Sequence, residues 1–252
     1  MQVFARAFWV PKAGNSETEY EDAFWPHKPL DAGGTCFRFA VADGATETSF
    51  SKIWAKQLVR AFCKGCLDAP TLFDYLPKLQ QRWSAIVRRR PLPWYAEEKV
   101  RSGAFAAILG LVLRDESEGA ACGEWQATAL GDSCLAQVRD EKVLARFPLD
   151  CSESFTNRPH LLSSNPAYTE QVFERLLRIE GTWMPGDTFY LMTDALAWWF
   201  MREVEAGMKP WYVLRDLGTV DQTEEFGQWI SNLRRSKEIR NDDVTLLRVD
   251  LV

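Results

Sequence analysis

Hydrophobic positions along the chain follow two different spacings, which predict strands near the N-terminus and helices after them. Residues 1–10 alternate loosely between apolar and polar side chains, and residues 35–42 form a mostly apolar run, so both segments predict strands. Residues 11–22 between them predict a polar loop. In residues 49–67 and 72–90 the apolar side chains recur at near-helical intervals, which predicts two helices.

A second series of strands and helices follows residue 100. Alternation is clear in residues 126–130, and short turns separate neighbouring segments, which is typical of antiparallel strands. The predicted strands are residues 103–115, 124–140, 142–149, 186–196 and 241–252, and the predicted helices lie in residues 195–234, broken near Gly207–Pro210. Because strands and helices do not alternate strictly, and no repeat or linker interrupts the chain, we expect one α+β domain over residues 1–252.

Composition excludes several classes of protein. The 252 residues are 46% hydrophobic, which suffices for a substantial core, and the net charge of -5 argues against nonspecific binding of nucleic acid. No apolar run reaches the roughly 20 residues that span a bilayer, and the N-terminus lacks the layout of a signal peptide. We therefore expect a cytoplasmic protein with no membrane partner. Six scattered cysteines form no disulfide framework, and two histidines exclude a histidine-rich metal site, so catalysis should rely on carboxylates.

Carboxylates recur beside the ends of the predicted strands. Any one of them alone is commonly a turn or capping residue. Four aspartates share this position: Asp43, Asp132 at the end or turn of a strand, Asp194 and Asp242. The pair Glu21-Asp22 stands in the loop after the first strand. Carboxylates from several strand ends that meet at one edge of a sheet repel one another unless a cation holds them. Oxygen ligands without His or Cys favour Mg²⁺ or Mn²⁺.

The order and wording of these acidic motifs make the chain resemble the metal-dependent PP2C (PPM) family of serine/threonine protein phosphatases. The matching pieces are EDAF (21–24), VADGAT (41–46), LGDS (130–133), LMTDAL (191–196) and NDDVTLL (241–247), in family order. The resemblance implies a four-layer α-β-β-α sandwich, with two antiparallel sheets flanked by helices and a two-metal site at one end. It also implies a stand-alone, bacterial-type enzyme that acts as a monomer on a phosphorylated protein.

Carried over position by position, the resemblance assigns ligands to two Mn²⁺ or Mg²⁺ ions. Asp43 is implied to bridge both ions, and Glu21 is implied to hold one of them together with the Gly44 carbonyl. Asp194 and Asp242 are implied to hold the other ion.

Two further acids complete the implied site. Asp22 is implied to orient metal-bound water, and Asp132 matches an acid associated with a third, weaker ion. Asp243 is the alternative to Asp242. We prefer Asp242 because the family pattern places this ligand two residues before the first apolar residue of the strand.

This ligand set implies a phosphoric monoester hydrolase acting on phosphoserine and phosphothreonine. Two cations about 3.5–4 Å apart lower the pKa of a bridging water and offset charge on the phosphoryl oxygens. The resulting hydroxide attacks phosphorus in line with the leaving alkoxide, so neither a covalent intermediate nor a conventional nucleophile is needed.

The chain departs from the family where the substrate phosphate is gripped. The family usually has an arginine four residues before the glutamate of the acidic pair, and that position here is Glu17. Lys12 in the same loop could substitute as a point charge, although a simply solvated lysine explains it equally well. Two alternatives therefore stay open: a degenerate PP2C-like domain that binds metal or a partner without efficient catalysis, and a hydrolase of a small phosphorylated molecule.

Specificity should depend on residues 70–100 and 200–240, because fold alone does not give function. The run Trp198-Trp199-Phe200 directly follows the Asp194 motif. Core packing explains these large side chains most simply, and a tryptophan at the rim of the site that recognises a peptide is the alternative.

Overall fold

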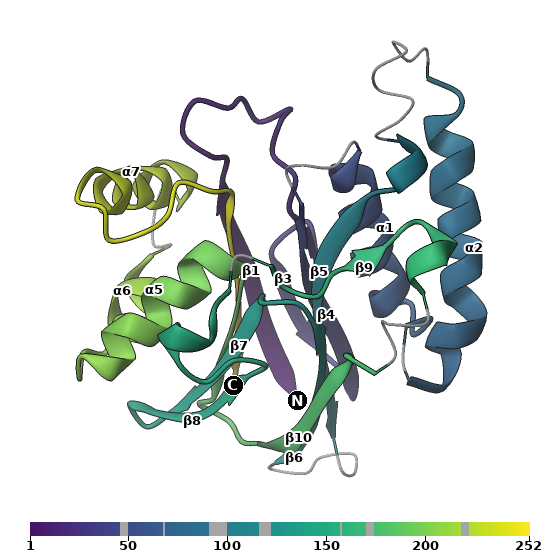
Figure 1. Ribbon diagram of the computed structural model, residues 1–252. Helices are drawn as coiled ribbons and strands as arrows, with labels where there is room; N and C mark the ends of the chain where they lie inside the picture. The colour runs from purple at the N-terminus through teal and green to yellow at the C-terminus, as the bar shows by residue number, and fades with distance from the viewer. Residues whose placement is uncertain are drawn as a thin grey trace.

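Two β-sheets pack face to face at the centre of the molecule, with helices on both outer sides (Figure 1). The computed structural model describes residues 1–45, 50–67, 69–90, 100–115, 122–156, 158–169, 174–217 and 222–252. Within these residues the strands form two six-stranded sheets whose paired strands are antiparallel. The antiparallel pairing predicted from the short turns is therefore confirmed.

The first sheet has the strand order β3-β1-β12-β11-β7-β8, and the second has the order β10-β6-β5-β4-β2 with β9 paired to β5. The strands of the first sheet are β1 (Gln2–Val10), β3 (Leu30–Gly33), β7 (Cys134–Arg139), β8 (Lys142–Phe147), β11 (Thr188–Met192) and β12 (Val244–Leu251). Those of the second are β2 (Ala23–Trp25), β4 (Cys36–Gly44), β5 (Phe105–Asp115), β6 (Gly123–Leu130), β9 (Leu162–Ser163) and β10 (Leu177–Trp183).

Alternating residues of each strand fill the space between the sheets, as the two-residue period of a strand requires. In β4, Phe39 and Val41 enter this layer, whereas Ala40 and Ala42 belong to the core on the other face. In β12, Leu247 and Val249 enter the same inner layer. Successive residues of a strand thus point alternately between the sheets and towards the helices.

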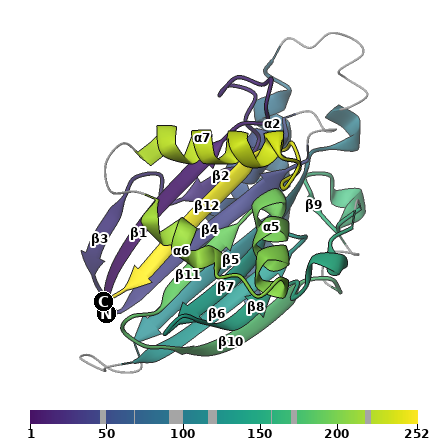
Figure 2. The same ribbon diagram turned by 90° about the vertical axis from the view of Figure 1, so that its left-hand side faces the viewer.

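Helices cover the outer face of each sheet, which gives the predicted four-layer α-β-β-α sandwich. Their amphipathic patterns place one apolar side of each helix on a sheet. On the second sheet lie α1 (Ser51–Cys63) and α2 (Ala69–Val87). On the first lie α5 (Asp194–Glu205), α6 (Pro210–Asp216) and α7 (Gln222–Arg235), which Figure 2 shows in front of it. None of the described helices has the length and apolar character needed to cross a lipid bilayer.

One glycine sets how closely α1 approaches its sheet. A Cβ atom on Gly110 of β5 would lie 2.2 Å from the ring of Phe62, a residue in the last turn of α1. The missing side chain therefore lets Phe62 pack directly on the strand. This contact holds α1, and with it Ser51 at the start of the helix, at a defined height above β4 and β5.

The structure corrects the prediction of one strand over residues 124–140. The chain leaves the second sheet after Leu130 and enters the first sheet at Cys134, so the segment forms two strands. Gly131 at this crossing has a φ of 108°, and a Cβ there would lie 2.4 Å from the Cβ of Ala107. A glycine satisfies both the backbone conformation and the close approach.

Other boundaries also differ from the prediction. The strand predicted for residues 186–196 ends at Met192, and α5 begins at Asp194. The break predicted near Gly207–Pro210 is confirmed, since α5 ends at Glu205 and α6 begins at Pro210. The prediction missed β2, β3 and β9, which are two to four residues long, and the edge strand β10, although its sequence LRIEGTW alternates.

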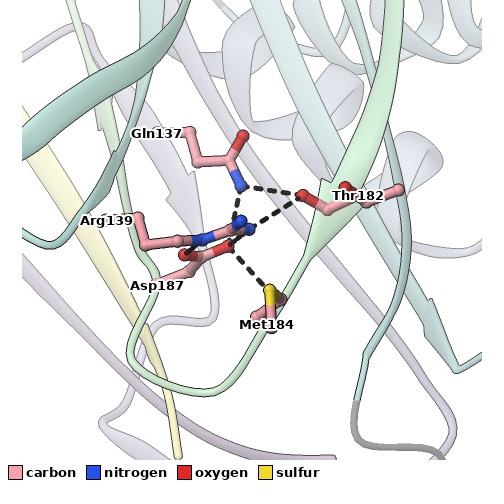
Figure 3. A network of polar contacts seen from close by, with 5 residues as sticks. All are labelled: Gln137, Arg139, Thr182, Met184 and Asp187. Carbon is pink, nitrogen blue, oxygen red and sulfur yellow. Dashed lines mark hydrogen bonds and ion pairs between the residues drawn. The ribbon is translucent and has the colours of Figure 1, made fainter.

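A buried aspartate anchors the turn between β10 and β11 (Figure 3). Asp187 is fully buried, and its Oδ1 accepts a bond of 2.5 Å from Nε of Arg139. Its Oδ2 accepts bonds of 2.8 Å from Nη2 of Arg139, 2.7 Å from Nε2 of Gln137 and 3.0 Å from the backbone N–H of Met184. Both carboxylate oxygens are thus satisfied by donors, as a buried charge requires.

Candidate active site

The end of β4 carries an acid into the layer between the sheets. Asp43 continues the alternating row of Phe39 and Val41, so strand geometry points its side chain between the two sheets. It lies one residue before the end of the strand, where the apolar layer stops and the side chain is half-buried. A position that would take a hydrophobic residue elsewhere in this row is therefore occupied by a carboxylate.

The pair Glu21-Asp22 is brought to the same place by strand pairing. Ala23 of β2 pairs with Ala42 of β4, and this register places Asp22 beside Asp43. Gly44 lies close to this pair, because a Cβ there would meet the carbonyl oxygen of Glu21 at 2.7 Å. The tight fit explains a glycine at this position.

Three further predicted residues come from the other connections at this end of the sandwich. Asp132 lies at the crossing from β6 to β7, Asp194 is the first residue of α5 after β11, and Asp242 lies two residues before β12. Each of them interacts electrostatically with Asp43, as does Asp22. The structure therefore brings together five of the acids that the sequence placed at strand ends.

Burial raises the pKa values of Asp43, Asp132 and Asp194. Burial, followed by the charges of Asp22 and Asp194, raises the pKa of Asp43 well above its usual range. Burial also raises the pKa of Asp194 to about 7, with Asp132 and Asp242 adding to the effect. The pKa of Asp132 is raised to about 6, again mainly by burial. The carboxylates as a group therefore resist carrying full negative charge together.

Asp22 is almost completely buried, with 1% of its surface exposed, and only one of its oxygens has a partner. Oδ2 accepts a bond of 2.6 Å from the hydroxyl of Thr245 in β12. Because the Thr245 proton points to Asp22, the Tyr20 hydroxyl, which contacts the same Thr245 oxygen, must donate to it. Among the described residues no group donates a hydrogen bond to Oδ1, so this oxygen can accept one from a bound group.

Sequence reasoning missed Tyr20 and Thr245 as members of the site. Burial raises the pKa of Tyr20 well above its usual value, and the charge of Asp22 raises it further, so Tyr20 stays a protonated donor. Thr245 lies in the inner row of β12 that includes Leu247 and Val249. A polar residue at the end of an apolar row is a signal that would have identified it.

Asp242 and Asp243 have different contacts. Asp243 accepts bonds from the backbone N–H groups of Lys12, at 2.7 Å, and Glu21, at 2.6 Å. It therefore joins the loop after β1 to the start of β12. The Asp242 carboxylate accepts a bond of 3.0 Å from the N–H of Asp243 and lies electrostatically close to Asp43. These contacts leave Asp242 the freer ligand of the two, in line with the preferred assignment.

The loop that carries Glu17 is tied to helix α1. Nζ of Lys52 donates to the carbonyl oxygens of Glu17 and Thr18, at 3.1 Å each. The Glu17 side chain is exposed. Lys12 is held at its backbone by Asp243, and its Nζ has no hydrogen bond or ion pair with any residue that the structure describes. The role predicted for Lys12 in binding phosphate stays a prediction.

The donor set suits hard divalent cations, although the side chains do not already form a closed cage. Carboxylate and carbonyl oxygens are the ligands that Mg²⁺ and Mn²⁺ prefer, and the free Oδ1 of Asp22 shows unused acceptor capacity. Among the described residues, no group of three His, Cys, Asp or Glu side chains is close enough to hold an ion. The residues fit the cations by chemistry and charge, and binding would require the side chains to draw together.

A cavity of about 870 Å³ lies elsewhere, beside the second half of α2. Its described lining includes Arg88, Arg90 and Arg101 and none of the clustered acids. Burial, charge and polar chemistry, rather than cavity size, therefore identify the carboxylate cluster as the candidate active site.

Comparisons with known proteins agree with this fold. The family model of protein phosphatase 2C matches residues 15–237. The serine/threonine phosphatase PstP/Ppp of Mycobacterium tuberculosis matches with a TM-score of 0.59 and 14% identity, covering 100% of this chain and 99% of that one. A search of curated proteins by sequence found no match.

Two further solved structures contain metals. The catalytic domain of PstP in complex with 2 manganese ions matches with a TM-score of 0.56 and 15% identity, over 99% of both chains. RsbX in complex with magnesium matches with a TM-score of 0.54 and 15% identity, over 100% of this chain and 96% of that one. At these identities the likeness establishes the fold, and the family assignment comes from the sequence match.

Proposed function

Because the chain belongs to the protein phosphatase 2C family, we propose that it is a metal-dependent phosphatase for phosphoserine and phosphothreonine in proteins. The observation that carries the proposal is the cluster of buried acids whose pKa values are raised by burial and mutual repulsion. Such an arrangement is costly without a function, and perturbed acids of this kind concentrate at functional sites.

Two Mn²⁺ or Mg²⁺ ions would be held by the predicted ligands. Asp43 would contact both ions, with Glu21 and the Gly44 carbonyl on one side and Asp194 and Asp242 on the other. Bound there, the cations would supply Lewis-acid chemistry that polarises the phosphoryl group and makes water a better nucleophile.

Asp132 would hold a third, weaker ion. This role is supported by its buried position in the crossing between the sheets and by its electrostatic contact with Asp194 and Asp242. A cation bound to one carboxylate would also lower the pKa of the neighbouring acids, because its positive charge favours their ionised forms.

The protein's own residues would orient the attacking water. The Thr245 hydroxyl donates a hydrogen bond to Asp22 and accepts one from the Tyr20 hydroxyl. This chain fixes Oδ2 and leaves Oδ1 of Asp22 to accept a hydrogen bond from the water. Attack in line with the leaving alkoxide then needs no covalent intermediate. The hydrogen-bonded series of Tyr20, Thr245 and Asp22 would thus orient a proton of the attacking water and keep that water on one face of phosphorus.

The proposal is tested by hydrolysis of phosphoseryl and phosphothreonyl peptides, with an aryl phosphate and small phosphorylated metabolites as competing substrate classes. We expect turnover that requires Mn²⁺ or Mg²⁺, stops with a chelator and is lost in Asp43→Asn. The loss should exceed about 100-fold, since removing only an outer partner of a metal ligand costs 10–100-fold. Full turnover in Asp43→Asn would refute the assignment of this site.

A second candidate function is a degenerate domain that binds metal without efficient catalysis. Two observations favour it: Glu17 at the position of the usual arginine, and the lack of three acids already close enough to hold an ion among the described residues. Metal stoichiometry separates the two functions. Titration calorimetry should find two Mn²⁺ ions bound together by the enzyme, whereas one loosely bound ion and no turnover would favour the degenerate domain.

A further inference from the structure

One face of helix α5 leads away from the carboxylate cluster. Asp194, Trp198 and Arg202 follow one another at intervals of four residues, so they lie along a single face of the helix. Residues 195–197 and 199–201 are buried, whereas Trp198 is half-buried and Arg202 is exposed. The ring of Trp198 therefore stands one helical turn from Asp194, at the rim of the site. The rim placement is the alternative that the sequence left open for this residue.

Two arginines contact the Trp198 ring. The guanidinium carbon of Arg202 lies 4.7 Å from the ring centroid, and that of Arg240 lies 5.5 Å from it. Arg202 comes from the same helix, whereas Arg240 comes from the segment between α7 and β12, two residues before Asp242. Contacts between a guanidinium and a tryptophan face are favourable and restrict the motion of the arginine.

Arg240 faces the acids without pairing with any of them. Its charge acts on both Asp132 and Asp194. Its side chain is exposed, and within the described residues its guanidinium forms no hydrogen bond or ion pair. By contrast, Nη2 of the neighbouring Arg234 donates to the Asp242 carbonyl at 2.6 Å. Arg240 thus keeps its full set of donors available beside the cluster.

We propose that Arg240, seated on the Trp198 ring, binds the phosphoryl oxygens of the substrate at the mouth of the carboxylate cluster. The inference rests on the proposed phosphatase function and adds a substrate-binding residue to it. A phosphate dianion that approaches a group of acids needs a cation at the entrance, and the planar guanidinium matches two phosphoryl oxygens at once. The loop of residues 11–22 has Glu17 at the position of the usual arginine, and Lys52 of α1 is already engaged with the carbonyl groups of Glu17 and Thr18.

The test compares Arg240→Ala, Arg240→Lys and Lys12→Ala with Arg202→Ala as the matched control. Arg202 contacts the same ring but is not among the charges that act on Asp132, Asp194 or Asp43. For each variant, kcat and KM for a phosphoseryl peptide, competitive inhibition by inorganic phosphate, and Mn²⁺ affinity by titration calorimetry are measured.

We expect Arg240→Ala to raise both KM and the inhibition constant of phosphate about 10-fold, the lower range for a lost charge-assisted bond at an exposed position. Arg240→Lys should recover part of this loss. The affinity for Mn²⁺ should stay the same or rise, because removing a positive charge cannot repel a cation. Arg202→Ala should leave all three measurements unchanged.

Three results would overturn the inference. They are an unchanged phosphate inhibition constant in Arg240→Ala, an equal loss in Arg202→Ala, and a loss in Lys12→Ala without one in Arg240→Ala. Weaker Mn²⁺ binding in Arg240→Ala would show a structural role instead. Absence of turnover in the wild type would defeat the proposed function separately. In that case, calorimetric titration of inorganic phosphate into the Mn²⁺-loaded wild type and Arg240→Ala still decides the role of Arg240.

Discussion

Strand β11 has an aspartate just beyond each end, and the two aspartates have opposite surroundings. Asp187, before the strand, is fully buried and receives four hydrogen bonds from Arg139, Gln137 and the backbone of Met184 (Figure 3). Asp194, after the strand, faces Asp43, Asp132 and Asp242, and its pKa is raised to about 7 mainly by burial. Two aspartates separated only by the five residues of β11 and by Thr193 therefore have different surroundings.

The difference separates a structural acid from an acid of the candidate active site. At Asp187 the protein supplies the positive charge and the donors itself, so the carboxylate stabilises the turn. Within the described residues, no cation forms an ion pair with the clustered aspartates, and Oδ1 of Asp22 accepts no hydrogen bond. Burial alone therefore does not identify an active site, whereas burial without internal compensation does, because an external ligand must then supply the missing charge.

The largest expected effect on stability comes from replacing Asp187, the aspartate whose charge is balanced by Arg139. Asp187→Asn should lower the free energy of unfolding by about 3 kcal/mol, because Arg139 and Gln137 lose a buried charged acceptor. Turnover per folded molecule should not change. Chemical denaturation measures the loss. Glu141→Gln, which breaks the exposed pair with Lys209, is the control and should cost less than about 1 kcal/mol. Equal effects in both variants would contradict the comparison.

Replacing one aspartate of the carboxylate cluster should have the opposite effect on stability. In a chelator at pH 8, Asp43→Asn should raise the free energy of unfolding, because the variant removes one of the negative charges that repel one another in the cluster. Added Mn²⁺ should stabilise the wild type by about 2.7 kcal/mol at 100 times its dissociation constant, and the variant much less. Thermal unfolding with and without metal measures both. If the variant is less stable than the wild type in chelator, the clustered carboxylates do not destabilise the metal-free protein by repelling one another.

The third prediction concerns pH. Without metal, Asp194 and Asp132 have folded-state pKa values of about 7 and about 6, above the ordinary value of 3.8. Groups with raised folded pKa values contribute stability at low pH and lose it as pH rises through the folded value. In chelator, this contribution should therefore fall between about pH 4 and pH 7.

The measurement is a series of denaturation curves from pH 4 to pH 8 in chelator. Asp194→Asn should flatten the decline. In the presence of Mn²⁺ the decline should weaken, because the cation takes the place of the protons. An identical pH profile in the wild type and Asp194→Asn would count against the shift at this residue.

The smallest effect is expected in the hydrogen-bond chain behind Asp22. Tyr20→Phe removes the donor to Thr245, which should lower turnover about 10-fold, as for other outer partners of metal sites. Stability should change by about 1 kcal/mol, the typical net value of one hydrogen bond. Steady-state kinetics at saturating Mn²⁺ measures the effect. Unchanged turnover would show that Asp22 is positioned without the chain.

Much of the fold could be predicted because its strongest signals are local. The apolar runs of β1, β4, β5 and β12 and the helical spacing of α1 were recognised from the sequence. The edge strands β3 and β10 were not: β3 is only four residues long, and the alternation of Leu177, Ile179 and Trp183 in β10 was overlooked. The two strands within residues 124–140 could not be separated, because a crossing between sheets leaves no period of its own.

The candidate site was predictable at the level of its acids but not of its supporting contacts. Asp43, Asp132, Asp194 and Asp242 each lie beside a strand end, which is a local feature. Tyr20 and Thr245 support Asp22 from a loop and a strand 225 residues apart, so no local pattern joins them. The same holds for Arg240, whose neighbour Trp198 belongs to another element.

The sequence by itself determined which residues alternate, where strands end in acids and which family the motifs resemble, because periodicity and motif order are properties of short segments. The tertiary structure alone decided which acids face one another, and within the described residues it gave Asp187 four hydrogen bonds and Oδ1 of Asp22 none. Charge compensation depends on distances between residues that are remote in the chain. Those distances exist only after the two sheets have packed together.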